Sequence, residues 1–433
     1  MINIKKYAEV TKNNLWTYTG EVTRVIGMGI ESKGPLANMG DICVVEARGD
    51  KEPITAEVVG FKEGHLMLMP LGSLEGIGPG CKVKAFGDKL TVKVDESLLG
   101  KVVDWKAMPI DGEMIYCKDI APIENDAPNP MSRKRIKTPL ELGVRAIDGM
   151  LTVGKGQRIG IFAGSGVGKS TLMGMIARNA LSDINIIALI GERGREVKEF
   201  IENDLKEEGL KRSIVVVATS DQPALMRLKA AKTATALAEY FREQGKDVLL
   251  MMDSLTRFSM AQREIGLAIG EPPVSRGYPP SVYAELPKLL ERAGNSDKGS
   301  ITGMYTVLVD GDDFNEPITD TARGILDGHI VLSRKLAHKA HYPAIDVLAS
   351  ISRVMSNIAT SEHKKMAAEL KKQMAIYKES EDLINVGAYN KGSNAEIDLA
   401  IEKNPSITSF LCQSVEDRVA FEETLNEMRN IVG

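Results

Sequence analysis

The sequence contains few aromatic residues, few cysteines and little net charge. Aromatic residues make up 5% of the 433 residues, and the formal net charge at pH 7 is −4. Proteins that bind nucleic acid use a basic surface or an aromatic stacking platform, so we expect no nucleic-acid partner. No two cysteines form a CxxC pair, which favours free thiols in a reducing cytoplasm over a disulfide framework or a zinc site. The cysteines are Cys43, Cys81, Cys117 and Cys412.

Long apolar segments are also missing. No apolar run reaches the roughly 18 residues that a membrane-spanning helix requires. The first residues, MINIKK, lack the apolar core of a signal peptide. We therefore expect a cytoplasmic protein that meets a membrane only peripherally. The contents of hydrophobic residues, 43%, and charged residues, 26%, are ordinary for a globular protein, and the length predicts about three domains.

One segment has the pattern of a phosphate-binding loop. The apolar strand RIGIFA runs into the turn GSGVG, which is followed by Lys169, Ser170 and a helical run. Glycines let backbone N–H groups approach phosphate oxygens, and a helix N-terminus attracts the same anion. Lys169 would contact the β- and γ-phosphates of a nucleoside triphosphate, and the Ser170 hydroxyl would coordinate Mg²⁺. The predicted nucleotide-binding residues of the loop are Gly164, Ser165, Gly166, Val167, Gly168, Lys169, Ser170 and Thr171.

One position departs from the usual motif. Ala163 stands where G-x-x-x-x-G-K-[ST] has its first glycine. Alanine is the smallest substitute and the other glycines remain, so we retain the motif. The alternative interpretation, a glycine-rich turn with a surface lysine, fits the order of strand, loop and helix less well.

Short strands with closely spaced turns dominate residues 18–94. Glycine-containing turns separate them, which is typical of a small β-barrel. Such a barrel binds oligonucleotides or serves as an assembly collar, and the scarcity of aromatic residues on its strands favours the collar. The strands are expected at Thr17–Ile26, Ile42–Ala47, Ile54–Phe61, His65–Met69 and Lys82–Ala85.

A proline-rich connector follows the barrel. Prolines between Ala121 and Pro139 predict an extended segment, which includes the basic run Arg133–Lys137. A basic run of this kind contacts RNA or lipid in some proteins. It is more often a solvated loop, and we favour that interpretation.

From about Gly156 to Arg353, apolar strands alternate with helical segments. This alternation predicts a parallel, doubly wound α/β sheet, with the phosphate-binding loop at the carboxyl end of its first strand. Beyond Arg353, amphipathic segments at Ser361–Tyr377 and Val415–Met428 predict a small helical domain. In the sheet region, strands are expected at Ile159–Phe162, Ile184–Ile190, Ile214–Ala218, Val248–Met252 and Ile301–Val309, and helices at Glu196–Glu208, Pro223–Gln244 and Tyr283–Ala293.

Two acidic residues follow strands downstream of the loop. Asp253 ends the apolar strand DVLLMMD, as expected for the aspartate that holds Mg²⁺ directly or through water. Glu192 ends the strand before it and would orient or deprotonate the attacking water. Glu192 and Glu196 could instead only favour a helix N-terminus electrostatically. We assign this second role to Glu196 and the catalytic role to Glu192.

Three long segments carry a resemblance to a known family. LIGERGREVKEFIE, VLLMMDSLTRFSMAQREIGLAIGEPP and GDDFNEPITDTARGILDGHIVLSRKLAHKAHYPAIDVLASISRVM resemble the ATPases of bacterial flagellar and type III secretion systems. This family is related to the catalytic subunit of rotary ATP synthases. The resemblance covers about Thr19 to Cys412, and AGSGVGKSTL and DLINVGAYNKGSNAEIDLAI are more similar to the flagellar branch.

The resemblance implies a fold and further site residues. The expected fold is a RecA-like α/β P-loop ATPase core with an N-terminal β-barrel and a C-terminal helical domain. The domains are expected at residues 1–92, 93–355 and 356–433. Arg353 matches the arginine finger that reaches a neighbour's site, although a surface or intrasubunit salt bridge is an alternative. Tyr342 matches the aromatic residue that stacks on adenine. Two further residues match arginines that line the phosphate site, Arg193 and Arg257.

The resemblance also implies a function and partners. The chain would hydrolyse ATP, with Mg²⁺, for the flagellar protein export apparatus at the inner face of the cytoplasmic membrane. Its partners would be identical subunits in a homohexamer, a coiled-coil stalk, export chaperones and substrates, and a membrane export gate. A peripheral stator-like regulator would bind the N-terminal segment within residues 1–14 as a short amphipathic helix, and a frayed terminus is the equally weighted alternative.

Other functions share parts of this pattern. The chain could be an injectisome type III secretion ATPase or the catalytic head subunit of a rotary proton-translocating ATPase. A pump head would carry out turnover only with a second kind of ring subunit. A hexameric RNA translocase would need a basic, aromatic-rich barrel. A regulatory nucleotide-binding protein would not need Glu192, whose position holds glutamine in non-catalytic subunits of related rings.

Overall fold

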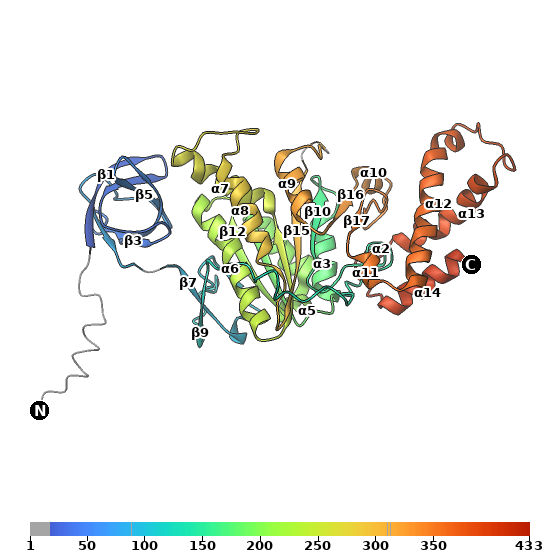
Figure 1. Ribbon diagram of the computed structural model, residues 1–433, viewed down its shortest axis with the longest axis horizontal. Coiled ribbons are helices and arrows are strands. Elements are labelled where there is room, and N and C mark those ends of the chain that lie inside the picture. Colours follow the sequence, from blue (N-terminus) through green and yellow to red (C-terminus); the bar gives the residue numbers. More distant parts are fainter. Residues whose placement is uncertain (1–17, 88, 310, 312) are drawn as a thin grey trace, which may run out of the picture.

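The computed structural model describes residues 18–87, 89–309, 311 and 313–433. Three bodies follow one another along its longest axis: a barrel, a central α/β body and a group of helices (Figure 1). This order confirms the predicted fold class. The predicted regulator-binding segment, residues 1–14, lies outside the described residues. None of the helices in the described ranges is long and apolar enough to cross a membrane.

The N-terminal body is a closed antiparallel barrel, as predicted. Its strands follow the order β1-β2-β5-β4-β3-β6, and β1 closes the ring by pairing with β6. The barrel ends at β6, because the next strand, β7 (Thr91–Val94), leaves it and pairs with β9 (Asp119–Pro122). The barrel strands are β1 (Tyr18–Ile26), β2 (Gly29–Lys33), β3 (Ile42–Val45), β4 (Ile54–Lys62), β5 (His65–Pro70) and β6 (Lys82–Ala85).

The central body is built on a mostly parallel sheet, which confirms the doubly wound prediction. Its strand order is β17-β16-β10-β15-β13-β11-β12-β8, with β14 paired to β15. The chain therefore crosses over between strands through helices, as parallel pairing requires. The strands are β8 (Val102–Val103), β10 (Arg158–Ala163), β11 (Ile184–Glu192), β12 (Ser213–Thr219), β13 (Asp247–Asp253), β14 (Gly294–Asn295), β15 (Ser300–Leu308), β16 (Gly328–Leu332) and β17 (Ile351–Ser352).

Both faces of this sheet are buried. Alternate residues of β11 enter two separate apolar cores, with Ile186 and Ile190 in one and Ile187 and Leu189 in the other. A strand that is covered on both faces carries apolar side chains on both, so its sequence is a continuous apolar run. This pattern is what predicted the strand from the sequence. The helices and short turns of the central body, outside residues 194–211, are η1 (Glu96–Leu98), α2 (Arg145–Met150), α3 (Lys169–Asn179), α6 (Ala224–Glu243), α7 (Leu255–Ala268), α8 (Pro280–Glu291), α9 (Pro317–Ile325), α10 (Arg334–His338) and α11 (Met355–Ile358).

The helix predicted at Glu196–Glu208 is wrong as one continuous element. The chain forms α4 (Gly194–Glu199), the π-helical turn η2 (Phe200–Leu205) and α5 (Lys206–Lys211) instead. Lys206 has a φ of 58°, outside the right-handed helical region, so a regular helix cannot continue through it.

The basic run is the solvated loop that its sequence indicated, except at Arg133. Arg133 donates a hydrogen bond of 2.7 Å to the Ala293 carbonyl oxygen, and its side chain is only 19% exposed. Lys134, Arg135 and Lys137 are exposed. Burial of one cation among carbonyl groups gives Arg133 a structural contact that composition cannot indicate.

The C-terminal body is helical, as predicted, but has one more helix than expected. It contains α12 (Ser361–Asn385), α13 (Ala395–Leu411) and α14 (Phe421–Val432). Sequence analysis missed α13, which contains Pro405 and has a weakly amphipathic pattern. Gly149 of α2 lies against this body, where an added Cβ would come within 2.8 Å of the Met428 sulfur and 3.0 Å of the Phe410 ring.

A buried charge cluster joins the barrel to the central body. Lys229 of α6 is 2% exposed, and its Nζ lies 2.8 Å from Glu57 of barrel strand β4 and 2.8 Å from Glu124 of the connector. Lys232 binds Glu124 at 3.0 Å and Glu285 of α8 at 3.0 Å. Burial raises the pKa of Glu124, but the two ammonium groups outweigh it and hold the pKa at about 2. Glu124 therefore remains ionised, whereas burial raises the pKa of Glu57 against the pull of Lys229. The contacts of Lys229 with both carboxyl groups join the barrel to the central body.

We expect Lys229→Ala to destabilise the joined bodies by about 3–5 kcal/mol, because it leaves the Glu57 carboxylate buried without its cation. Urea unfolding followed by fluorescence measures this loss. Lys211→Ala is the matched control, since Lys211 pairs with Glu207 at the surface and its removal should leave the midpoint unchanged. Equal midpoints for both variants would show that the buried pair does not stabilise the interface.

Candidate active site

The phosphate-binding loop joins β10 to α3. Gly166 and Gly168 have φ values of 76° and 87°, which glycine adopts without the clash that a Cβ would cause. Gly168 precedes α3 and provides no side-chain cap to the helix. The N-terminus of α3 therefore presents its backbone donors and its positive dipole end to an anion.

Three residues far apart in sequence meet beside this loop. The Lys169 Nζ lies 2.5 Å from Asp253 Oδ1 at the end of β13 and 3.7 Å from Glu192 Oε1 at the end of β11. Thr306 of β15 donates a 2.7 Å hydrogen bond to the same Asp253 oxygen. All these side chains are largely buried, so the charges interact through little water. The Lys169 ammonium group balances the negative charge of these carboxylates. It would also attract the oxygens of a bound phosphate.

A β-bulge places Glu192 beside Lys169 and Asp253. The register between β11 and β12 shifts between Ile190 and Glu192, and Gly191 has a φ of 70°. A Cβ at Gly191 would lie 3.0 Å from the Arg257 Cβ, so the backbones approach closely here. Burial and the neighbouring Asp253 raise the pKa of Glu192 to about 7, although Lys169 opposes the shift. A pKa near neutrality suits a carboxylate that accepts a proton from water.

The donors for a magnesium ion lie around one small cavity. Ser170, Glu192 and Asp253 line a space of about 120 Å³, together with Asp204 of η2. Hydroxyl and carboxylate oxygens are the ligands that Mg²⁺ prefers, and its other positions are usually filled by phosphate and water. Within the described ranges, no group of three or more His, Cys, Asp and Glu side chains forms a metal cage. Ser170 and Asp253 therefore fit an ion that enters with a nucleotide.

Two acidic residues of this cavity, Asp204 and Glu199, were missed by sequence reasoning. The Asp204 carboxylate interacts with the Thr171 hydroxyl of the loop, and burial raises its pKa. An added Cβ at Gly174 of α3 would lie 2.7 Å from the Asp204 Cβ, so η2 packs tightly on α3. No motif marks Asp204, because its proximity depends on the irregular turn η2.

The two arginines predicted to line the phosphate site, Arg257 and Arg193, lie at different places relative to the loop. The buried Nε of Arg257 has no hydrogen-bond partner among the described residues, which leaves a donor for an anion near Gly191. Arg193 is 79% exposed and pairs with Glu196 at 3.2 Å, so it is not part of the cluster around Lys169.

The Tyr342 ring lies against the loop, 3.6 Å from where a Cβ of Gly168 would be, and is 44% exposed. Its free face can receive a base.

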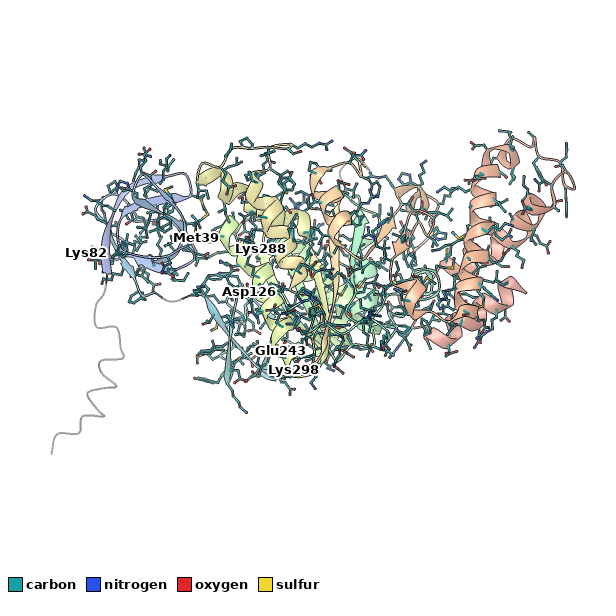
Figure 2. All side chains as sticks on the ribbon, in the orientation of Figure 1. Met39, Lys82, Asp126, Glu243, Lys288 and Lys298 are labelled. Carbon is teal, nitrogen blue, oxygen red and sulfur yellow. The ribbon has the colours of Figure 1, made fainter. Side chains whose placement is uncertain are left out.

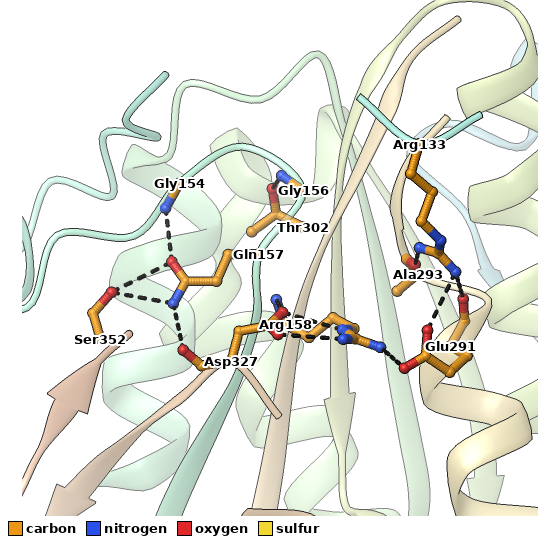
Figure 3. A network of polar contacts seen from close by, with 10 residues as sticks. All are labelled: Arg133, Gly154, Gly156, Gln157, Arg158, Glu291, Ala293, Thr302, Asp327 and Ser352. Carbon is orange, nitrogen blue, oxygen red and sulfur yellow. Dashed lines mark hydrogen bonds and ion pairs between the residues drawn. The ribbon is translucent and has the colours of Figure 1, made fainter. Parts of the chain in front are cut away.

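Arg353 lies at the opposite edge of the sheet. It follows β17, and its N–H donates to the Asp327 carbonyl oxygen at the start of β16. Figure 3 shows Ser352 and Asp327 beside Gln157, where β10 begins, whereas the loop follows the end of β10. Six residues at about 3.3 Å each separate the two edges by roughly 20 Å. Arg353 therefore does not reach the loop of its own chain.

The surroundings of Arg353 also speak against an intrasubunit salt bridge. The guanidinium is exposed and donates to the Arg323 carbonyl oxygen at 3.3 Å. Among the described residues it has no carboxylate within ion-pair distance. The cation is available to a group outside this chain. The loop, the aspartate that ends β13 and the doubly wound sheet together define a P-loop ATPase.

Comparison with known proteins places this ATPase more narrowly. Three family models match successive parts of the chain: the beta-barrel domain of the ATP synthase alpha/beta family at residues 22–87, the nucleotide-binding domain of that family at 143–352, and the T3SS EscN ATPase C-terminal domain at 359–430. The chain belongs to the ATP synthase alpha/beta family, in the group of flagellum-specific and type III secretion ATPases.

Individual relatives cover nearly the whole chain. The flagellum-specific ATP synthase of Bacillus subtilis is 58% identical over 96% of this chain and 95% of its own length. The type 3 secretion system ATPase of Xanthomonas euvesicatoria is 51% identical over 95% and 93%. The structure of the assembled ATPase EscN from enteropathogenic E. coli superposes with a TM-score of 0.89 and 47% identity, covering 96% of this chain and 100% of that one. The resemblance inferred from the motifs is confirmed.

We expect kcat/KM for ATP to fall about tenfold per pH unit below pH about 7, because Glu192 must be ionised to accept a proton and its raised pKa is about 7. The carboxylate form, and with it the activity, is present above this pKa and is lost as the pH falls. Steady-state rates between pH 5.5 and 9 measure the profile.

Glu192→Gln provides the comparison, with turnover lowered about 10²–10⁴-fold, no such pH limb and retained ATP binding. Lys169→Ala is the second control and should lose ATP binding while keeping its circular dichroism spectrum. Unchanged turnover in Glu192→Gln would remove the assignment of the catalytic base.

Proposed function

We propose that the chain hydrolyses Mg-ATP as a homohexamer for the flagellar protein export apparatus. The observation that carries this proposal is the meeting of Lys169, Glu192 and Asp253 beside the phosphate-binding loop. Relatives of both branches match at overlapping identities, 58% and 48% for the flagellum-specific ATP synthases of Bacillus subtilis and Salmonella typhimurium and 51% for the type 3 secretion system ATPase of Xanthomonas euvesicatoria. We propose the flagellar role over the injectisome because the segments AGSGVGKSTL and DLINVGAYNKGSNAEIDLAI are more similar to the flagellar branch. We further propose the domain division 1–92, 93–355 and 356–433, within which the three family matches fall.

The cluster suggests how nucleotide enters. Lys169 would exchange its contact with Asp253 for the β- and γ-phosphates, since phosphate oxygens carry more charge than one carboxylate. The released Asp253 carboxylate and the Ser170 hydroxyl would hold Mg²⁺, which neutralises charge on the phosphates when bound. Glu192 would orient the attacking water and accept its proton. Arg257 would donate to a phosphate oxygen through its Nε, and Tyr342 would stack on the base.

The position of Arg353 supports a ring. Its cation is exposed at the sheet edge opposite to its own loop, so it can complete only a site on another subunit. A finger of this kind contributes about 10³–10⁵-fold to the rate. Arg193, which is also exposed, would reach phosphate only if its loop moved on nucleotide binding or assembly.

Assembly partners follow from the relatives. One solved relative is an assembled ATPase, and a second, at a TM-score of 0.88, is the same ATPase in complex with its central stalk EscO. We propose the same assembly for this chain, with a coiled-coil stalk in the ring. A stator-like regulator, export chaperones and substrates, and a membrane export gate would complete the set, on the cytoplasmic side of the membrane.

Arg353→Ala should abolish turnover alone and regain activity when mixed with Lys169→Ala. Each subunit then supplies what the other lacks, an intact loop or an intact finger. ATPase assays on mixed rings, with assembly followed by light scattering, measure this recovery. Well-assembled mixed rings that stay inactive would contradict a finger that acts in trans.

The flagellar assignment has its own test. We expect the chain to restore swimming in a motile bacterium that lacks its flagellum-specific ATPase, and the Glu192→Gln variant to fail at equal expression. Swimming on soft agar measures the result. Restoration of injectisome secretion without restoration of swimming, in a host that carries both systems, would move the assignment to the injectisome.

A further inference from the structure

We infer that Gln157, Ser352 and Asp327 position Arg353 for its contact with the neighbouring subunit. The inference rests on the proposed function, because it takes Arg353 as the residue that acts in trans. The geometry behind it is that these three residues meet where Arg353 leaves the sheet, at the beginning of β10 (Figure 3).

The Arg353 side chain is not fixed by its own surroundings. It is exposed, and in the described part of the chain its guanidinium contacts the Arg323 carbonyl oxygen at 3.3 Å. A long, exposed side chain samples many rotamers. A charge that must meet a phosphate across a subunit boundary therefore needs a fixed backbone from which to extend.

Hydrogen bonds from three elements fix that backbone. The Arg353 N–H donates to the Asp327 carbonyl oxygen at 3.0 Å. The Ser352 hydroxyl donates to the Thr152 carbonyl oxygen at 2.8 Å and accepts from Gln157 Nε2 at 3.1 Å. The same Nε2 also donates to the Asp327 carbonyl oxygen at 3.1 Å. Gln157 thus bridges the residue before Arg353 and the residue that Arg353 itself contacts.

The Gln157 side chain is held in one conformation. It is 0% exposed, and its Oε1 accepts a 2.9 Å hydrogen bond from the Gly154 N–H. A Cβ at Gly328 would lie 2.5 Å from the Ile351 carbonyl oxygen, so β16 and β17 approach as closely as only glycine permits. The two-residue strand that precedes Arg353 pairs with β16 and is also held by the hydrogen bonds of the Ser352 hydroxyl.

A chain of ion pairs braces Asp327 from the other side. Arg158, the first residue of β10, donates to the Asp327 carboxylate from its backbone N at 3.0 Å, its Nε at 3.1 Å and its Nη2 at 3.2 Å. Arg158 Nη1 also contacts Glu291, the last residue of α8, which in turn pairs with Arg133 at 3.4 Å (Figure 3). Because β10 ends in the phosphate-binding loop, Asp327 joins the Arg353 segment to the strand of the chain's own nucleotide site.

Two variants test the positioning. Ser352→Ala removes the hydroxyl beside Arg353, and Asp327→Asn weakens the brace at constant size. We expect each to lower kcat about tenfold in homogeneous rings, with KM for ATP changed by less than about twofold, because the loop that binds ATP is untouched. Ser352→Thr, which keeps the hydroxyl, should restore most of kcat. Ser356→Ala, at an exposed serine of α11, is the matched control and should leave kcat unchanged.

Mixing separates a positioning role from a general structural one. A Ser352→Ala or Asp327→Asn subunit has an intact loop and a misplaced finger, so mixing with Lys169→Ala subunits should restore activity. Loss of activity that mixing does not restore, or loss of the ring in light scattering, would overturn the inference. Arg353→Ala mixed with Lys169→Ala is the reference pair. If this reference mixture also stays inactive, the proposal that Arg353 acts in trans is wrong. If the reference mixture recovers activity and the Ser352→Ala and Asp327→Asn mixtures do not, only the positioning role is wrong.

Discussion

The attraction between Lys169 and the carboxylates of Asp253 and Glu192 is the interaction on which the site depends. It forms only because β10, β13 and β11 run parallel and end at the same edge of the sheet. Parallel pairing needs helical crossovers, and these cover both faces of the sheet with apolar side chains. The buried core therefore positions the charges, and their low exposure makes each contact strong and raises the pKa of Glu192.

The predicted site residues are divided between the carboxyl edge and the amino edge of the sheet. The carboxyl edge holds the loop, the carboxylates of Glu192 and Asp253, and Tyr342. The amino edge, where Lys298 is labelled in Figure 2, holds Arg353 and the hydrogen bonds that fix its backbone. One chain cannot bring these edges together, because a strand is rigid along its length. This geometry supports the proposal that a second copy completes the site, for which a ring is the simplest closed form.

Charge also determines how the outer bodies attach. The barrel meets the central body through Lys229 and Glu57, a buried pair whose formation costs desolvation and whose loss costs more. The C-terminal helices attach through an ion pair between Arg145 and Glu427 at 3.0 Å, through apolar contacts around Gly149, and through a 2.7 Å contact between His363 Nε2 and the Gly149 carbonyl oxygen.

The sequence by itself determined the three bodies, the parallel sheet, the loop with Lys169 and the carboxylates Glu192 and Asp253, because glycine spacing and apolar runs depend on local chemistry alone. It missed α13, where Pro405 obscures the pattern, and the break at Lys206, where a single backbone angle ends the helix. Only the tertiary structure placed Asp204 in the cavity, Arg193 outside it and Arg353 at the far edge. These positions depend on how strands and turns pack, and packing joins residues that no local pattern connects.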